Sequence, residues 1–134
     1  MSEQNVRALQ ISTAVIEIST GFALLIFPSV TAELLLGQKL KSLVDLSMAR
    51  FSGGGLLTLG IVCWMVPGQL HSPISRGLVV AMLFYYIAVA GALAFASLHL
   101  GLHGSALWPI IVLHAAMSAW CAITMKQRPP ASTV

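Results

Sequence analysis

The chain has 134 residues, of which 57% are hydrophobic and only 8% are charged, and its formal net charge is +3. Soluble domains carry about 25% charged residues, so this composition excludes an ordinary soluble domain. The seven basic residues fall at or near the ends of apolar segments. Lipid headgroups explain that placement better than nucleic acid does, so we expect a lipid bilayer as the first partner and no nucleic-acid partner.

Four apolar segments are long enough to cross a bilayer, which takes about 20 residues per helix. The stretch from Gly77 to Met125 contains no Asp, Glu, Lys or Arg and holds two of these segments. We expect helices over residues 7–27, 43–66, 76–99 and 105–125 of a single domain, 1–125, followed by a disordered cytoplasmic tail over 126–134. The predicted fold class is all-α, an integral membrane four-helix bundle.

The connection between the first two spans is the longest and carries its own signals. The first span is expected to end at Pro28, and the residues up to Ser42 are too few and too interrupted to cross the bilayer. Their leucines predict a turn or short helix lying at the interface. Ser42 followed by Asp45 has the spacing of a capping box and predicts the start of the second span. The distribution of Lys and Arg favours both termini in the cytoplasm.

Small residues recur at the spacing of helix-packing faces. They are Ala49 and Gly53, then Ala88, Ala92 and Ala96, then Ala115 and Ala119. In lipid, such faces let helix backbones approach closely, so we expect them at contacts inside the bundle. The triplet from Gly53 to Gly55 could instead admit a ligand. Cys63 and Cys121 fall near the same end of their spans and are expected to be free structural thiols.

Glu17 lies in the middle of the first span, where a charge costs from about 3 to over 10 kcal/mol. A rise of ~1.5 Å per residue places Glu17 ~15 Å, Arg50 ~10 Å and His114 ~13 Å below the helix ends on one side of the bilayer. We expect the three groups to share one layer, with a buried Glu17–Arg50 ion pair and His114 beside it. Tyr85 and Tyr86 are placed somewhat deeper.

Polar residues follow helical periodicity on two of the spans. The first span carries Gln10, Thr13, Glu17 and Thr20 on one face, and the fourth carries His114, Ser118 and Cys121. Two polar stripes in one bundle are expected to face each other, because unsatisfied polar groups in hydrocarbon cost several kcal/mol. The candidate pocket comprises Thr13, Glu17, Arg50, Tyr85, Tyr86, His114 and Ser118. An ion pair that only fixes helix packing is the alternative interpretation.

Two histidines have the spacing of metal ligands, but only if one helix continues through Gly101. His99 and His103 are these weak candidates for zinc or copper. The surrounding sequence LHLGLHGS instead predicts a helix end and a turn, so we assign no metal. His114 as a haem ligand lacks an evident second ligand, and the sequence requires no cofactor.

The segments TGFALLIFPSVTAELLLG and MARFSGGGLLTLGIVCW resemble the opening half of the DoxX-like group of small four-helix bacterial membrane proteins. The resemblance covers about residues 20–66: a span ending in Pro, a Leu-Gly segment, and Arg50 opening the next span. It implies a bacterial inner-membrane location and association with other membrane subunits. For some members it implies a quinone-linked oxidoreductase complex, with a quinone as the cofactor.

Three functions are compatible with these residues. The first is an accessory subunit of a redox complex, or a self-associating bundle that binds a small apolar ligand in the polar pocket. The second is a proton-coupled carrier similar in outline to small multidrug transporters, against which Arg50 argues because it would hold Glu17 ionised and occupied. The third is a cofactor-free intramembrane isomerase or cyclase with Glu17 and His114 as acid and base. The sequence leaves open whether the protein is an enzyme.

Overall fold

The computed structural model describes residues 3–66 and 72–126, and every regular element in these ranges is an α-helix. The helices are α1 (Glu3–Ile26), α2 (Pro28–Leu36), α3 (Leu43–Met65), α4 (Pro73–Leu100) and α5 (Leu107–Lys126). All except α2 are long and apolar enough to cross a membrane. The structure therefore confirms an all-α chain with four candidate spans. The predicted tail beyond Lys126 lies outside the described residues.

Local sequence signals set the helix ends. The Ser42 hydroxyl accepts the Asp45 N–H at 3.0 Å and the Asp45 carboxylate accepts the Ser42 N–H at 3.3 Å, which confirms the predicted capping box. Pro28 opens α2 as a separate short helix. α4 begins about one turn earlier than predicted, because Ser72 caps it and Pro73 fits the first helical position.

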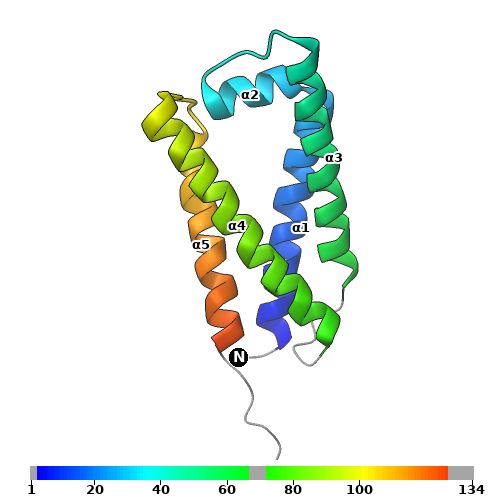
Figure 1. Cartoon of the computed structure of the whole chain (residues 1–134). Helices are drawn as coiled ribbons and strands as arrows, with labels where there is room; N and C mark the ends of the chain where they lie inside the picture. The colour runs from blue at the N-terminus through cyan, green and yellow to red at the C-terminus, as the bar shows by residue number, and fades with distance from the viewer. Residues whose placement is uncertain (1–2, 67–71, 127–134) are drawn as a thin grey trace, which may run out of the picture.

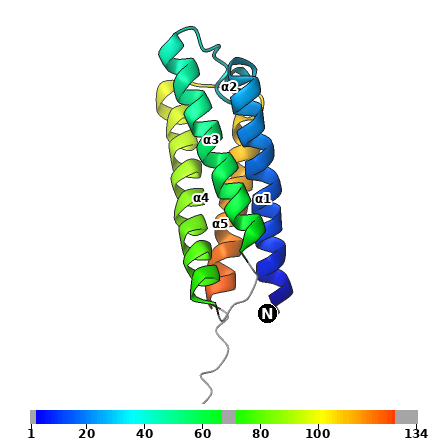
Figure 2. The same cartoon turned by 90° about the vertical axis from the view of Figure 1, so that its right-hand side faces the viewer.

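The bundle consists of two antiparallel helix pairs, α1 with α3 and α4 with α5 (Figures 1 and 2). The pairs lie close together at the end where α1 begins and α5 ends, and they diverge toward the opposite end (Figure 1). There α2 lies across the bundle and contacts α1, α3 and α5. The two pairs are thus joined by side-chain packing at one end and by a short helix at the other.

The α1–α3 contact is made by glycines through which the two backbones touch. A Cβ atom on Gly21 would lie 2.7 Å from the Gly53 carbonyl oxygen, and one on Gly60 would lie 3.0 Å from the Ile18 nitrogen. The predicted packing role of Gly53 is therefore confirmed. The alanines predicted to pack on α4 and α5 do not lie at such contacts. Ala88, Ala92, Ala115 and Ala119 are exposed, so the prediction that they pack inside the bundle of a single chain is wrong.

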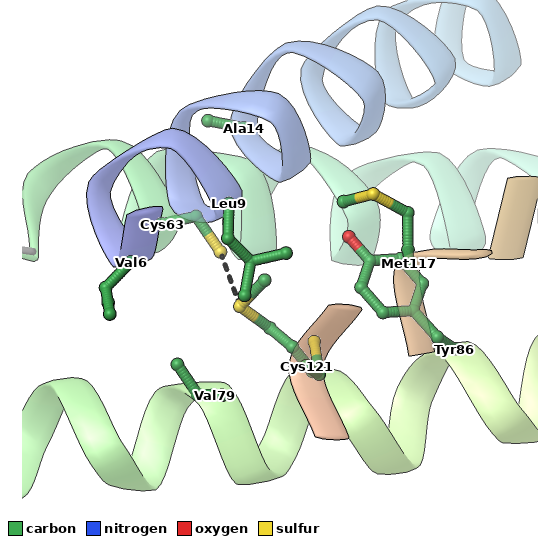
Figure 3. Packing of buried hydrophobic residues seen from close by; sticks show 9 residues of the cluster. Val6, Leu9, Ala14, Cys63, Val79, Tyr86, Met117 and Cys121 are labelled. Atoms are coloured by element: carbon green, nitrogen blue, oxygen red, sulfur yellow. Dashed lines mark hydrogen bonds between the residues drawn. The ribbon is translucent and has the colours of Figure 1, made fainter. Parts of the chain in front are cut away.

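The packed core lies in the half of the bundle away from α2. It joins buried side chains of α1, α3, α4 and α5: Val6, Leu9, Ala14, Cys63, Val79, Met82, Tyr86, Met117 and Cys121 (Figure 3). In the other half fewer side chains are buried, and α4 has no buried residue from Ile87 to Ala96. The outer faces expose large apolar side chains such as Phe51 and Phe84. Exposed apolar surface of this extent is what a lipid-facing helix presents.

Hydrogen bonds to backbone carbonyl groups connect the helices at both ends of the bundle. At the packed end, Nη1 of Arg7 donates to the carbonyl oxygens of Trp64 and Val66 at 3.1 and 3.2 Å, which caps the C-terminus of α3. At the other end, the Ala106 N–H donates to the Leu34 carbonyl at 2.9 Å. This second bond fixes α2 to the start of α5.

Candidate functional site

The Glu17 carboxyl group lies buried between α1 and α4, with 1% of the residue exposed. The Tyr85 hydroxyl donates a hydrogen bond of 2.9 Å to Glu17 Oε2. The second oxygen, Oε1, has no hydrogen-bond partner among the described residues. A buried carboxylate usually has several donors or a cation beside it, so this one is short of partners.

The donor of that hydrogen bond, Tyr85, lies beside two other rings, one from α4 and one from α5. The Tyr85 ring centroid lies 5.4 Å from that of Tyr86 and 6.0 Å from the His114 imidazole, and Tyr86 lies 5.5 Å from His114. Tyr85 is half-buried, whereas Tyr86 and His114 are buried. The rings form a continuous aromatic wall beside Glu17.

Thr13 connects this wall to α1. Its hydroxyl donates to the Leu9 carbonyl at 2.9 Å and lies 2.7 Å from the Tyr86 hydroxyl. Because the one proton of Thr13 goes to Leu9, the Tyr86 hydroxyl is the donor in the second bond. Tyr86 is thereby held in a fixed orientation.

His114 is oriented by its own helix. Its Nδ1 lies 2.8 Å from the Ile110 carbonyl oxygen, which can only accept, so Nδ1 carries the proton. A neutral ring in this tautomer presents Nε2 as a hydrogen-bond acceptor. Glu17 Oε1 is the acceptor without a partner among the described residues at this site, and His114 adds a second acceptor atom on a neighbouring ring.

A second polar pair lies nearer the packed end. The side-chain amide of Gln10 donates to the Ser75 hydroxyl at 3.1 Å, and Gln10 Oε1 has no partner among the described residues. Ser75 was missed by the sequence analysis, which ended the preceding loop at this residue. The signal was present in Ser72 and Pro73, which place Ser75 in the first turn of a helix.

The structure brings together Thr13, Glu17, Tyr85, Tyr86 and His114, which we call the Glu17 site. It does not form the predicted Glu17–Arg50 ion pair: Arg50 is exposed, and Glu17 bonds to Tyr85 instead. Within residues 3–66 and 72–126 the salt bridge found is a surface pair, Lys39 with Glu33, at 3.7 Å.

The reason for this error is the register of α1 against α3. Gly53 lies opposite Gly21 and Gly60 lies opposite Ala14, so Glu17 is level with the middle of α3. Arg50 is level with Leu24 near the end of α1, about seven residues or ~10 Å from Glu17 along the helix axis. The predicted depths of Glu17 and Arg50 are counted from the end of α1 and the start of α3. These two helix ends are not at the same height, so the counted depths are not comparable.

Ser118 and the paired histidines also lie outside the site. Ser118 is half-buried and donates to the Ala115 carbonyl of its own helix at 2.8 Å. α4 ends at Leu100, and Gly101 adopts φ +66°, so the predicted turn between His99 and His103 is confirmed. Both histidines are exposed. The described residues contain no group of three or more His, Cys, Asp or Glu that could hold a metal ion.

The Glu17 site has the chemistry of an acceptor cluster beside aromatic faces. Its acidic group is the Glu17 carboxyl, and the described part of the chain places no salt-bridge cation against it. Such a site suits a proton, a cation or a hydrogen-bond donor, and none of its residues supplies a positive charge for an anion. Comparison with protein-family models, with curated proteins and with solved structures finds no match. The resemblance to the DoxX-like group therefore stays a prediction.

Proposed function

We propose that the protein is an integral membrane protein that binds a small, largely apolar cation inside its helix bundle, with Glu17 as the counter-ion. The observation that supports this function best is the buried carboxyl group with one unpartnered oxygen. An ionised carboxylate without a cation is costly at low dielectric, and a bound cation offsets that cost.

The aromatic wall supports the same class of ligand. A cation within about 6 Å of a tyrosine face is attracted by the ring quadrupole, by ~0.5–2 kcal/mol depending on how dry the site is. Tyr85 and Tyr86 lie beside Glu17 and present such faces. The acceptor Nε2 of His114 adds a partner for an N–H group on the ligand.

A lateral route from the lipid fits the packing. The helix pairs diverge toward α2 (Figure 1). α4 has no buried residue between Ile87 and Ala96. α3 and α4 make few contacts with each other. Tyr85 is half-buried, bonds to Glu17 and precedes this loosely packed stretch of α4 by two residues, so an apolar ligand entering there would come close to Tyr85.

Tetraphenylphosphonium is a suitable probe because it is apolar and permanently cationic. We expect the full chain in lipid nanodiscs to bind it, and Glu17→Gln to weaken binding by at least about tenfold, or ~1.4 kcal/mol. Glu33→Gln is the matched control, because Glu33 is an exposed carboxylate. Arg50→Gln should also leave binding unchanged. Equal binding by the wild type and Glu17→Gln would contradict the proposal.

Proton-coupled transport is the second candidate, and one observation favours it. The ion pair with Arg50 that argued against this function is not formed, which leaves Glu17 able to exchange a proton for a cation. In proteoliposomes, a pH gradient should then drive tetraphenylphosphonium movement that Glu17→Gln abolishes. Binding without gradient-driven movement would limit the protein to a binding role.

The other expectations remain predictions. A redox-complex subunit and an intramembrane isomerase use the same residues, and no described contact distinguishes them. The bacterial inner membrane and the cytoplasmic placement of both termini likewise stay inferences from the sequence. Co-purification with a larger complex would favour the subunit.

A further inference from the structure

Three sulfur-containing side chains from three different helices meet in the packed core. They are Cys63 on α3, Met82 on α4 and Cys121 on α5, and each is 0% exposed. The Cys63 thiol donates to Met82 Sδ at 3.8 Å, and Cys121 points into the same cluster (Figure 3). Both cysteines are free. This cluster takes no part in the Glu17 site.

The sulfur spacing matches that of two ligands on one metal ion. With metal–sulfur bonds of about 2.3 Å and a tetrahedral to trigonal angle between them, two ligand sulfurs lie ~3.8–4.0 Å apart. The Cys63 to Met82 distance of 3.8 Å falls in this range. These two side chains could therefore share an ion with little rearrangement, with Cys121 as a third donor.

The donor set selects a soft ion. Thiolate and thioether sulfur favour Cu(I), whereas zinc prefers four ligands drawn from Cys, His and carboxylates. The described residues hold no such set of three or more His, Cys, Asp or Glu. Methionine is not one of those residue types, and the Met82 thioether is the third sulfur ligand beside the two cysteines.

Charge balance also favours a monovalent ion. If Cu(I) binds and one thiol releases its proton to solvent, the site consists of one thiolate, one Cu(I) ion, one neutral thiol and one thioether, with no net charge. Its neighbours include the buried apolar side chains of Val6, Leu9 and Val79. A neutral centre can be buried among them at far lower cost than a charged one.

Two of the three sulfur ligands lie near helix ends at the packed end of the bundle. Cys63 precedes the end of α3 at Met65, and Cys121 precedes the end of α5 at Lys126. These separations correspond to ~3 Å and ~8 Å along the helix axes. We propose that Cys63, Met82 and Cys121 form a Cu(I)-binding site at the packed end of the bundle.

Anaerobic titration of the full chain against Cu(I) held by bicinchoninic acid tests this site. The wild type should remove one Cu(I) per chain, seen as loss of the colour of the Cu(I)–bicinchoninate complex. Met82→Leu conserves side-chain volume, so the fold should persist while affinity falls by about tenfold or more. Cys63→Ser and Cys121→Ser should lower it further.

Met117→Leu is the matched control, because Met117 belongs to the same buried cluster and should leave binding unchanged. X-ray absorption at the copper edge should show sulfur neighbours in the wild type and one fewer in Met82→Leu. The proposal is overturned if the wild type takes no Cu(I) from bicinchoninate. It is equally overturned if Met82→Leu and Met117→Leu bind Cu(I) alike.

Discussion

A Cβ atom on Gly53 would lie 2.8 Å from the carbonyl oxygen of Gly21, closer than real Cβ contacts come. The α1–α3 pair is therefore built on direct backbone contact, with no room for the smallest side chain. Because this contact fixes the register of the two helices, it also decides which residues of α3 lie level with Glu17.

Gly53→Ala should destabilise the protein, since neither backbone can yield without separating the helices. Overpacking of this kind costs about 1–3 kcal/mol, so we expect Tm to fall by several degrees. Gly54→Ala is the matched control: a Cβ there meets nothing within 4 Å, and replacing a helical glycine gains up to ~1 kcal/mol. Thermal unfolding in one detergent compares the two variants, and equal Tm values would contradict the backbone contact.

Tyr85→Phe should cost more stability than Tyr86→Phe, although each removes one hydrogen-bonded hydroxyl. Without Tyr85, Glu17 loses its described donor, and an unsatisfied buried group costs about 1–3 kcal/mol. Without Tyr86, Thr13 keeps its bond to the Leu9 carbonyl. Adding Glu17→Gln to each variant in a double-mutant cycle should show coupling to Tyr85 and little to Tyr86. The reverse order of coupling would refute the assignment.

Arg7→Ala should loosen the end of α3 and lower stability by about 1–2 kcal/mol, because the guanidinium both bonds and electrostatically stabilises the last carbonyls. Arg7→Lys should retain part of the effect through its charge. Arg76→Ala serves as the control, since Arg76 is an exposed basic residue on the first turn of α4. Hydrogen exchange of the last turn of α3 reports the local change. Unaltered exchange in Arg7→Ala would rule out the cap.

Gly104→Ala should detach α2 from the turn between α4 and α5. A Cβ at this position would collide with the backbone of Leu34 and Leu35, which cannot move without breaking the bond from Ala106. Gly101→Ala provides the comparison, because Gly101 has φ +66° but open space around it, so only backbone strain of ~1–2 kcal/mol is expected. Proteolysis of the α2 segment should accelerate in Gly104→Ala alone. Equal rates in both variants would show that strain, and not the collision, matters.

Sequence reasoning succeeded where the signal is local. The length of the apolar runs predicts the candidate spans, and the Ser42–Asp45 spacing predicts the start of α3. Periodicity on α1 places Thr13 and Glu17 on one buried face, because a helix repeats its faces whatever it packs against.

Sequence reasoning failed where a contact depends on the register of two packed helices. Arg50 was paired with Glu17 on the assumption that helix ends are level, and hydropathy does not encode the glycine contact that offsets them. The exposure of Ala88 and Ala115 likewise depends on which pair of helices each belongs to. The hydrogen bond that attaches α2 to the start of α5 is made by backbone atoms, so no pattern of side chains in the sequence predicts it.

That attachment has a consequence for synthesis. The segment that follows the first span reaches its final anchor, the amide of Ala106, only after α3 and α4 have been made. Until then a nascent chain carries α2 without its bond to the last helix. Synthesis of the turn before the last helix is thus the step that completes this connection, and a ribosome-stalled chain ending before residue 104 should hold α2 only through its contacts with α1 and α3.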